Sequence, residues 1–180
     1  MSQITPTDTG TSDAELVRRY LDGEIAAGEV LFGRHWPRSW RAAYAVAGSA
    51  TAADDATQAA VERAIRGLDG FNIARPFGPW LARIAVNQAL NNLRVARREV
   101  PLVDEHQSAD LYGEVDNRDE VIHAVAALPA DQRVVVALRY WADMSREEIA
   151  AVTDTPLGTV ASRLSRALTT LRTNLGEVSL

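Results

Sequence analysis

Apolar residues recur at helical spacing along almost the whole chain, and this pattern limits the possible folds more than any other feature. Residues 13–32 and 54–68, for example, carry apolar side chains three and four positions apart, which places them on one face of a helix. No segment alternates apolar and polar residues with the two-residue period of a half-buried strand, and no longer unit repeats. The sequence therefore predicts an all-α fold.

Segments rich in helix breakers separate the predicted helices. A further helix is expected over residues 36–44, and it ends at the Gly-Ser-Ala-Thr run of residues 48–51. The loop 69–78 combines breakers with aromatic residues. A long helix is then expected from Pro79, a suitable first-turn proline, to about Arg98.

Residues 99–117 differ from the segments on either side. They are acidic, contain a proline and a glycine, and lack helical periodicity, so we expect a flexible linker. About four more helices are expected over residues 118–180. The sequence thus predicts two small helical domains, residues 1–98 and 118–180, joined by an acidic linker.

The net charge of -5 conceals a strong segregation of charge. Residues 34–98 carry ten arginines and four acids, whereas residues 99–127 carry one arginine and eight acids. Charge asymmetry of this kind is more informative about partners than the total charge. All 19 basic residues are arginine. We attribute that overall bias to a GC-rich genome rather than to phosphate or guanine contacts, so each arginine is interpreted by its position.

Several classes of protein find no support in the sequence. There is no cysteine, which excludes disulfides and thiolate metal sites, and the three histidines lack metal-ligand spacing. No phosphate-binding glycine loop, nucleophile elbow or metal cluster indicates an enzyme or a cofactor. No apolar run approaches the length of a membrane span, and the polar, acidic N-terminus is unlike a signal peptide. We therefore expect a soluble, cytoplasmic protein without catalytic activity.

Residues 145–171 carry the signals of a helix-turn-helix in the second domain. Ser145-Arg146-Glu147-Glu148 is a capping box, in which the serine and the second glutamate bond to each other's backbone amides. The short helix that it begins is expected to end near Thr153. The next helix is expected to start at Thr155-Pro156, with the threonine as N-cap and the proline at the first position.

The second helix of this motif has two contrasting faces. Its apolar stripe is formed by Val160, Leu164, Leu168 and Leu171. Its opposite face carries no acid and is formed by Thr159, Ser162, Arg163 and Arg166. Short hydroxyls and arginines can reach phosphates and base edges in a major groove. A helical hairpin with a solvated polar face is the alternative, and the absence of acids favours DNA docking over it.

Two longer blocks of sequence carry a family pattern. Residues 128–168 include Leu128-Pro129, Leu138-Arg139-Tyr140, Glu148-Ile149-Ala150 and Gly158-Thr159-Val160. The amino-terminal half includes Leu16-Val17-Arg18-Arg19-Tyr20, Asp54-Asp55-Ala56-Thr57-Gln58 and Phe77-Gly78-Pro79-Trp80-Leu81. These blocks resemble region four and region two of the extracytoplasmic-function sigma factors, members of the sigma-70 family of bacterial RNA polymerase. Since the resemblance covers nearly the whole chain in the family's order, it implies a factor that directs promoter-specific transcription initiation.

The resemblance implies a polymerase-binding surface on the helix that begins near Asp54. In the family this helix binds the clamp helices of the largest subunit of core RNA polymerase, whose beta flap is a further expected partner. The polar residues at helical spacing here are Asp55, Gln58 and Glu62, opposite a core stripe expected to contain Val61, Ile65 and Leu68. A solvated face is the alternative interpretation.

One position departs from the family's pattern on this surface. The family usually has a glutamate after the glutamine, and this chain has Ala59. Polymerase binding is therefore expected to be weaker than usual or to be shifted to Glu62 and Arg63.

The aromatic loop 69–78 matches the family segment that captures a base flipped out of the −10 promoter element. The residues suited to this task are Phe71, Asn72 and Phe77, because aromatic rings stack on an unpaired base and an amide can bond to its edge. Trp80 is instead expected to pack in the core.

The helix after this loop carries a polar stripe without an acid, formed by Arg83, Asn87, Asn91, Arg94 and Arg98. In the family this helix contacts the −10 region. Asparagine is unfavourable inside a helix, so two asparagines in register with three arginines indicate a surface that meets nucleic acid. We call these five residues the −10 stripe.

The resemblance assigns the helix after Pro156 to the −35 element. Many relatives carry a basic residue where this chain has Ala161, so we expect a phosphate contact to be lost and Ser165 and the flanking arginines to fix the register. The acidic linker either threads toward the polymerase active-site cleft, as in the family, or is a solvating spacer. A cognate anti-sigma factor is a candidate partner. The alternative function is a helix-turn-helix regulator that does not bind core polymerase.

Overall fold

The chain forms a stack of helices in the computed structural model, which describes residues 10–99 and 119–175. In order, the helices are α1 (Asp13–Leu21), α2 (Ile25–Ala47), α3 (Ala50–Arg66), the 3-10 turn η2 (Leu68–Gly70), α4 (Phe77–Glu99), α5 (Asp119–Ala126), α6 (Ala130–Tyr140), α7 (Arg146–Thr153) and α8 (Leu157–Leu175). Within those two ranges no residue is in a strand, so the predicted all-α class is confirmed. Nearly all of the predicted linker, residues 99–117, lies outside the described residues.

The first two helices divide at a different point from the one predicted. The break falls at residues 22–24, where Gly23 has a φ of 99°, and α2 then continues without interruption through Pro37. A proline inside a helix leaves the carbonyl four residues earlier without its donor. Here that carbonyl belongs to Gly33, an exposed residue, so water can supply the missing hydrogen bond.

Side-chain and glycine caps fix two of the predicted helix boundaries. Gly48 ends α2 in the left-handed region, with a φ of 72°. Ser49 then caps α3 by accepting a hydrogen bond from the Ala52 amide, so this helix begins at Ala50 and not near Asp54, where the sequence predicted its start. The capping box of α7 is present, with the Ser145 amide 2.8 Å from the Glu148 carboxylate. These sequence signals work because each satisfies a backbone group that the helix end leaves unpaired.

The start of α8 differs from the prediction by one residue. The helix begins at Leu157, and the carbonyl of Pro156 accepts the first hydrogen bonds, from the Thr159 and Val160 amides. Thr155 is therefore not the N-cap. Its hydroxyl instead donates to the Thr153 carbonyl at 3.2 Å.

Helix α3 packs on α2 and α4 through small side chains. Its fully buried positions are Ala53, Ala56, Thr57, Ala60 and Ala64. This row replaces the predicted stripe of Val61, Ile65 and Leu68, in which only Leu68 is fully buried and Ile65 is 42% exposed. The alanines occupy the buried face because they let the helix backbones approach closely, which larger side chains would prevent.

The N-terminal end of the molecule is held by aromatic and ionic contacts. Asp13 of α1 binds both Arg34, at 2.7 Å, and His35, at 2.8 Å, on α2. Beneath them the rings of Phe32 and Phe77 meet edge to face, with centroids 5.6 Å apart. These contacts fix the start of α4, and with it the loop before it.

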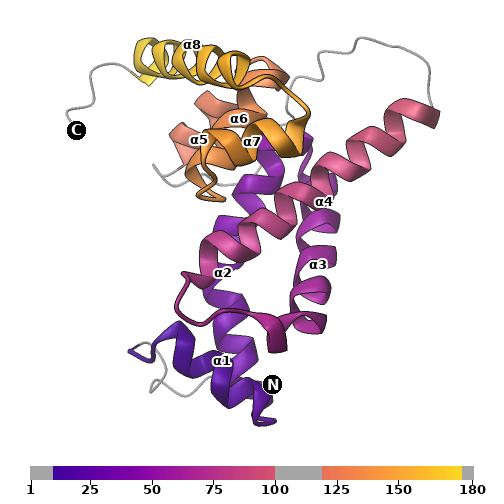
Figure 1. Cartoon of the computed structure of the whole chain (residues 1–180), viewed down its shortest axis with the longest axis vertical. Coiled ribbons are helices and arrows are strands. Elements are labelled where there is room, and N and C mark those ends of the chain that lie inside the picture. Colours follow the sequence, from indigo (N-terminus) through magenta and orange to yellow (C-terminus); the bar gives the residue numbers. More distant parts are fainter. Residues whose placement is uncertain (1–9, 100–118, 176–180) are drawn as a thin grey trace.

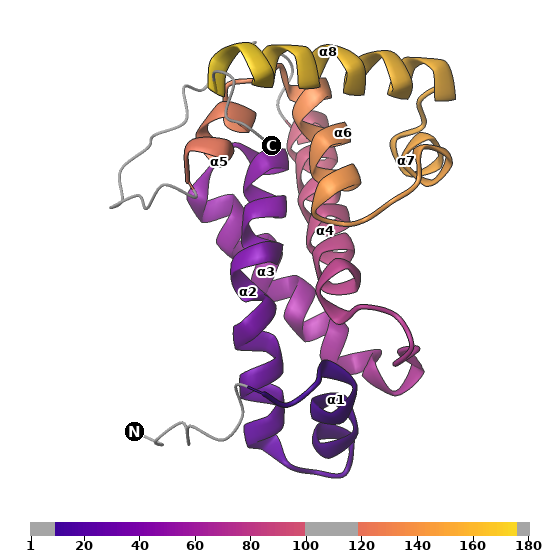
Figure 2. The ribbon, with the colours of Figure 1, turned by 90° about the vertical axis from the view of Figure 1, so that its left-hand side faces the viewer.

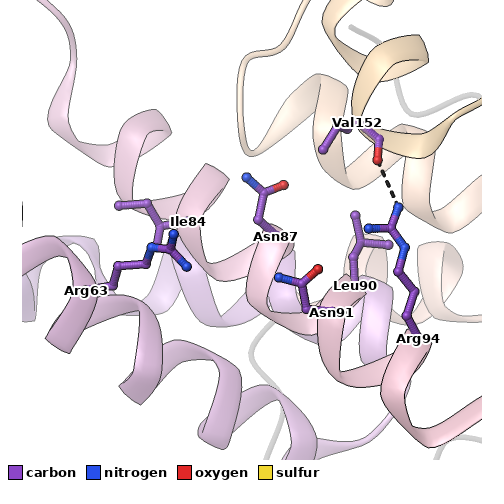
Figure 3. A pocket seen from close by; sticks show the side chains of 7 residues that line it. All are labelled: Arg63, Ile84, Asn87, Leu90, Asn91, Arg94 and Val152. Carbon is purple, nitrogen blue, oxygen red and sulfur yellow. Dashed lines mark hydrogen bonds between the residues drawn. The ribbon is translucent and has the colours of Figure 1, made fainter. Parts of the chain in front are cut away.

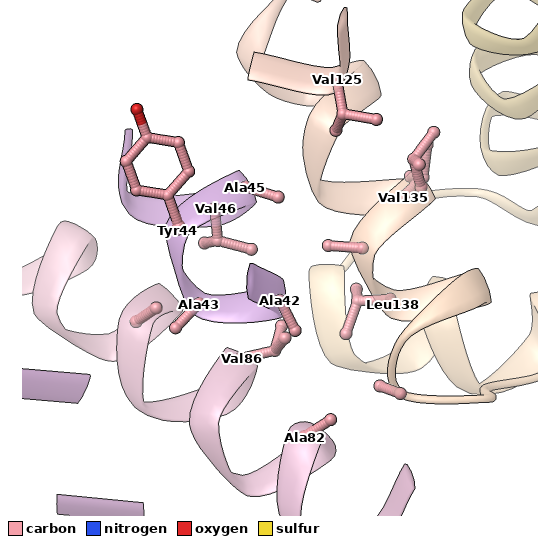
Figure 4. Packing of buried hydrophobic residues seen from close by; sticks show 14 of the residues in the cluster. Ala42, Ala43, Tyr44, Ala45, Val46, Ala82, Val86, Val125, Val135 and Leu138 are labelled. Carbon is pink, nitrogen blue, oxygen red and sulfur yellow. The ribbon is translucent and has the colours of Figure 1, made fainter. Parts of the chain in front are cut away.

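The two predicted domains are in contact. A single buried apolar cluster includes Ala42 and Val46 of α2, Val86 of α4, and Val135 and Leu138 of α6 (Figure 4). Helices α5–α8 form one end of the molecule and α1 lies near the other, with α8 lying across the top in Figure 2.

A polar contact reinforces this junction. The Arg38 guanidinium on α2 donates to the carbonyls of Trp141, at 3.0 Å, and Tyr140, at 3.3 Å. It therefore caps the C-terminal end of α6, where the unpaired carbonyls favour a cation.

Candidate nucleic-acid interface

Helix α4 carries the −10 stripe on the side that faces α7 and the end of α3. From Phe77 to Arg98 the helix contains no acid. Its core is formed by Leu81, Ala82, Ala85, Val86 and Ala89, which pack on α2 and α3. This burial leaves the arginines and asparagines on the remaining face, as the helical spacing predicts. The side chain of Arg98 lies outside the described residues.

The stripe borders a cavity of about 250 Å³. Asn87, Asn91 and Arg94 of α4 line it, together with Arg63 of α3 and Val152 of α7, as Figure 3 shows. Arg63 was predicted to be a polymerase contact. The structure places it beside the −10 stripe, so the basic surface extends from α4 onto α3, and the polymerase contact of Arg63 stays a prediction.

Two residues of the stripe are bound to the helix-turn-helix. The Arg83 guanidinium forms an ion pair with Glu148 at 3.0 Å. Arg94 donates a hydrogen bond to the Val152 carbonyl at 3.1 Å. Both partners belong to α7, so this helix lies against the −10 stripe.

The Glu148 carboxylate is held in its charged form at this contact. The backbone amide of Ser145 donates to it, and this hydrogen bond, followed by those from Arg83, places its pKa below the ordinary value of 4.5. A lowered carboxylate pKa means that the charge, and the ion pair with Arg83, persist at neutral pH. Both are lost only as the pH falls through this lowered pKa.

The aromatic loop 69–78, called the −10 loop below, contains the three residues predicted to bind a flipped base. One of them is exposed, one is half-buried and one is buried. Asn72 is exposed, with its side-chain oxygen accepting a hydrogen bond from the Ala74 amide. Phe71 is half-buried and packs on Trp80, with ring centroids 4.6 Å apart. Phe77 is completely buried, so its predicted role in stacking on a base is corrected: it is a core residue. Trp80, also half-buried, packs against Phe77, in line with its expected core role.

The outer face of α8 is partly exposed and partly tied to its own domain. Ser162, Ser165 and Arg166 are exposed, and Thr159 is half-buried. Arg163 is also half-buried and forms an ion pair with Asp131 of α6 at 2.9 Å. The surface available to a major groove is therefore centred on the three exposed residues.

The predicted polymerase-binding face of α3 is exposed to solvent. Asp55, Gln58 and Glu62 all point away from the core, and Ile65 continues the same face three residues further on. Asp54 differs, because its carboxylate accepts a hydrogen bond from the Trp40 indole at 2.7 Å. The face thus combines acids, an amide and one exposed apolar side chain.

Sequence reasoning missed the structural roles of three residues: Ile65 on the exposed face of α3, Glu148 beside the −10 stripe, and Arg38 at the end of α6. Ile65 was assigned to the core, and no pattern distinguishes it from a core isoleucine. Glu148 was explained fully by the capping box, and its contact with Arg83 spans 65 residues. Arg38 lies in the arginine-rich segment, but nothing local indicates its partners on α6.

Within the described ranges, no helix has the length and apolar character needed to cross a bilayer.

Two family models match the chain in succession. Residues 31–99 match sigma-70 region 2, and residues 118–171 match sigma-70 region 4. The first match covers α3, the −10 loop and α4, and the second covers the helix-turn-helix. The match to region 2 leaves the alternative of a polymerase-independent regulator without support.

Similar proteins agree with these matches. The chain is 35% identical to the ECF RNA polymerase sigma factor SigM of Mycobacterium tuberculosis, over 93% of this chain and 87% of that protein. It is 34% identical to the ECF RNA polymerase sigma-E factor of Escherichia coli, over 87% of this chain and 90% of that protein.

Solved structures give the same result. The sigma factor RpoE of Bartonella quintana, in complex with the anti-sigma factor NepR, has a TM-score of 0.55 and 26% identity, covering 90% of this chain and 99% of that one. CnrH in complex with the cytosolic domain of CnrY has a TM-score of 0.55 and 28% identity, covering 93% and 99%. The chain therefore belongs to the extracytoplasmic-function sigma factors of the sigma-70 family, which direct RNA polymerase to promoters.

Proposed function

We propose that this sigma factor divides its work between residues 1–98 and residues 118–180, which residues 99–117 join. The first part binds core polymerase through α3 and opens the −10 element with the loop before α4 and with the −10 stripe. The second part reads the −35 duplex with α8. The observation that carries this proposal is the acid-free stripe on α4, which adjoins the exposed face of α3 and precedes a capped helix-turn-helix.

Linking two weak DNA readers explains why neither needs high affinity alone. The tether raises the effective concentration of the second reader once the first has bound, so both promoter elements must be present at the correct spacing. Ala161 fits this scheme, since it offers no phosphate contact at a position where many relatives have one. The factor itself then needs no catalytic group, and it acts in the cytoplasm, where core polymerase and promoter DNA are found.

A cognate anti-sigma factor is a further proposed partner. The two solved structures described above contain a sigma factor bound to NepR in one case and CnrH bound to part of CnrY in the other. An inhibitor of this chain would be expected to cover the exposed acidic face of α3 or the end of the −10 stripe at Asn91 and Arg94, where the stripe is exposed.

Co-purification with core polymerase tests the assignment of α3. We expect Asp55→Arg to weaken core binding about tenfold or more, because it places a cation in a face of acids and amide. Glu120→Arg makes the same charge change on an exposed residue of α5 and serves as the control. If both variants bind core polymerase as the wild type does, α3 is not the docking helix; if the wild type fails to bind, the proposed function falls.

A further inference from the structure

One histidine of α2 lies between α1 and the first turn of α4. The Nε2 atom of His35 is 2.8 Å from the carboxylate of Asp13 on α1. On its other side the imidazole packs against Phe77, with ring centroids 5.4 Å apart. Gly78 makes this approach possible, because a Cβ there would lie 2.7 Å from Nδ1 of His35. A single imidazole, only 17% exposed, therefore connects α1 to the start of α4.

The bond to Asp13 fixes the orientation of the imidazole. A carboxylate only accepts hydrogen bonds, so Nε2 of His35 carries a proton and donates it to Oδ2 of Asp13. The other carboxylate oxygen, Oδ1, accepts from Arg34 at 2.7 Å, which holds the carboxylate in place. The imidazole is thus bonded at one edge and packed against Gly78 at the other. Its ring is held against Phe77 as a consequence.

Phe77 continues this row of contacts into the −10 loop. Its ring is completely buried and meets Phe71 edge to face, with centroids 5.5 Å apart. Phe71 immediately precedes Asn72, the exposed amide that the proposed function gives to an unpaired base. Close-packed side chains transmit a displacement to their neighbours. The position of the loop therefore depends on His35, although His35 itself lies outside the loop.

We propose that His35 is a positioning residue for the opening of the −10 element. Through its bond to Asp13 it holds Phe77, and with it the −10 loop, in the shape that receives an unpaired base. The proposal rests on the function proposed above for that loop. It also gives a part in promoter opening to α1, which precedes residue 31, where the match to sigma-70 region 2 begins.

Two substitutions of His35 separate the hydrogen bond from the bulk of the ring. The side-chain amide of glutamine extends as far as Nε2 of histidine and can donate to Asp13. The amide of asparagine extends only as far as Nδ1, so it cannot reach the carboxylate. His35→Gln and His35→Asn both remove the ring contact with Phe77 and differ in the bond to Asp13.

A second pair of variants breaks the contact from the side of α1. Asp13→Asn removes the charge that faces His35. Glu15→Gln is the matched control, because it removes a charge from the same first turn of α1. Glu15 forms an exposed ion pair with Arg18 of its own helix, at 3.2 Å. The two variants therefore change the net charge and the helix start alike.

Opening is measured with core polymerase and a promoter that the wild-type holoenzyme selects from a library of random-sequence duplexes. Permanganate, which oxidises unpaired thymines, reports the ratio of open to closed complexes. His35→Asn should lower this ratio about threefold to tenfold, the effect of one lost hydrogen bond, and His35→Gln should stay within about twofold of the wild type. Asp13→Asn should also lower the ratio, and Glu15→Gln should leave it unchanged.

A template whose −10 element is already unpaired by mismatches distinguishes positioning from a general loss of structure. All four variants should bind core polymerase as the wild type does. At saturating holoenzyme they should transcribe this template equally, because base capture no longer has to offset the cost of unpairing. A damaged fold would instead lower transcription from both templates.

Three results would overturn the proposal: normal opening by His35→Asn, equal losses in His35→Asn and His35→Gln, or a loss that persists on the unpaired template. If the wild-type holoenzyme selects no promoter at all, the proposed function fails instead. The two failures are therefore distinguishable.

Discussion

Arg163 and Arg166 occupy adjacent positions on the outer face of α8, but they differ in burial and in bonding partners, so we expect them to have different functions. Arg163 is half-buried and ion-paired with Asp131, whereas Arg166 is exposed and its side chain donates to the carbonyl of Ser162 on its own helix. We expect Arg166→Ala to weaken binding of a −35 duplex by about 1–3 kcal/mol, the usual value of a base contact. Fluorescence anisotropy with a labelled duplex measures this loss.

Asp131→Asn separates positioning from DNA contact at Arg163. If Arg163 mainly holds α8 against α6, the Asp131 variant should lower duplex affinity and thermal stability together, by at most about 1 kcal/mol each, because the pair is partly exposed. An increase in duplex affinity would instead mean that Asp131 competes with DNA for Arg163.

Gly28 is required where α2 crosses α1. A Cβ at this position would overlap the ring of Tyr20, so Gly28→Ala must displace the ring that meets Phe32 edge to face. We expect a loss of about 1–3 kcal/mol in the free energy of unfolding. Gly33→Ala is the control, because its Cβ meets nothing within 4 Å, and it should stabilise the helix by about 0.5–1 kcal/mol. Urea denaturation compares the two, and equal effects would contradict the close approach.

At the scale of helices, local signals predicted the Gly48 and Ser145 boundaries correctly but did not predict which face of α3 is buried. The Ser145 capping box and the Gly48 terminus act on backbone groups a few residues away, so a short window of sequence contains the whole interaction. Burial on α3 depends instead on how closely α2 and α4 approach. That distance is set by small residues on all three helices, and an isolated stretch of sequence does not contain it.

Ala60 and Ile65 provide a test of this explanation for α3. Ala60 is completely buried, so Ala60→Leu should overpack the α2–α3–α4 contact and cost about 1–3 kcal/mol. Ile65 is 42% exposed, so Ile65→Ala should change stability by less than about 1 kcal/mol while lowering affinity for core polymerase. Chemical denaturation and core binding measure the two effects. A larger loss of stability at Ile65 than at Ala60 would restore the original core assignment.

At the scale of the whole molecule, the sequence predicted two helical units but not their contact. The Arg38 bond to the Trp141 carbonyl joins residues 103 positions apart, and no periodicity or motif reports a pairing of that range. The −10 stripe was predicted from the residues of α4 alone. The contacts of Arg83 and Arg94 with α7 follow only from the three-dimensional structure.

Loss of the Arg38 cap should loosen the junction. Arg38→Ala removes two hydrogen bonds to the end of α6, with an expected cost of about 1 kcal/mol. A compact chain of 180 residues has a radius of gyration of about 16 Å, so small-angle scattering should report a larger value for the variant than for the wild type. Arg41→Ala, a change of the same kind one residue past Trp40 on α2, serves as the control. Identical radii for wild type and Arg38→Ala would show that the apolar cluster alone holds the halves together.

Transcription in vitro with purified core polymerase tests most directly the claim that the two halves act as one promoter reader. The chain should direct transcripts whose start sites share a −10 and a −35 element, and changing the spacing between those elements by half a helical turn should abolish them. Transcripts that tolerate any spacing would contradict the two-reader account. The absence of any transcript that depends on the chain would contradict it entirely.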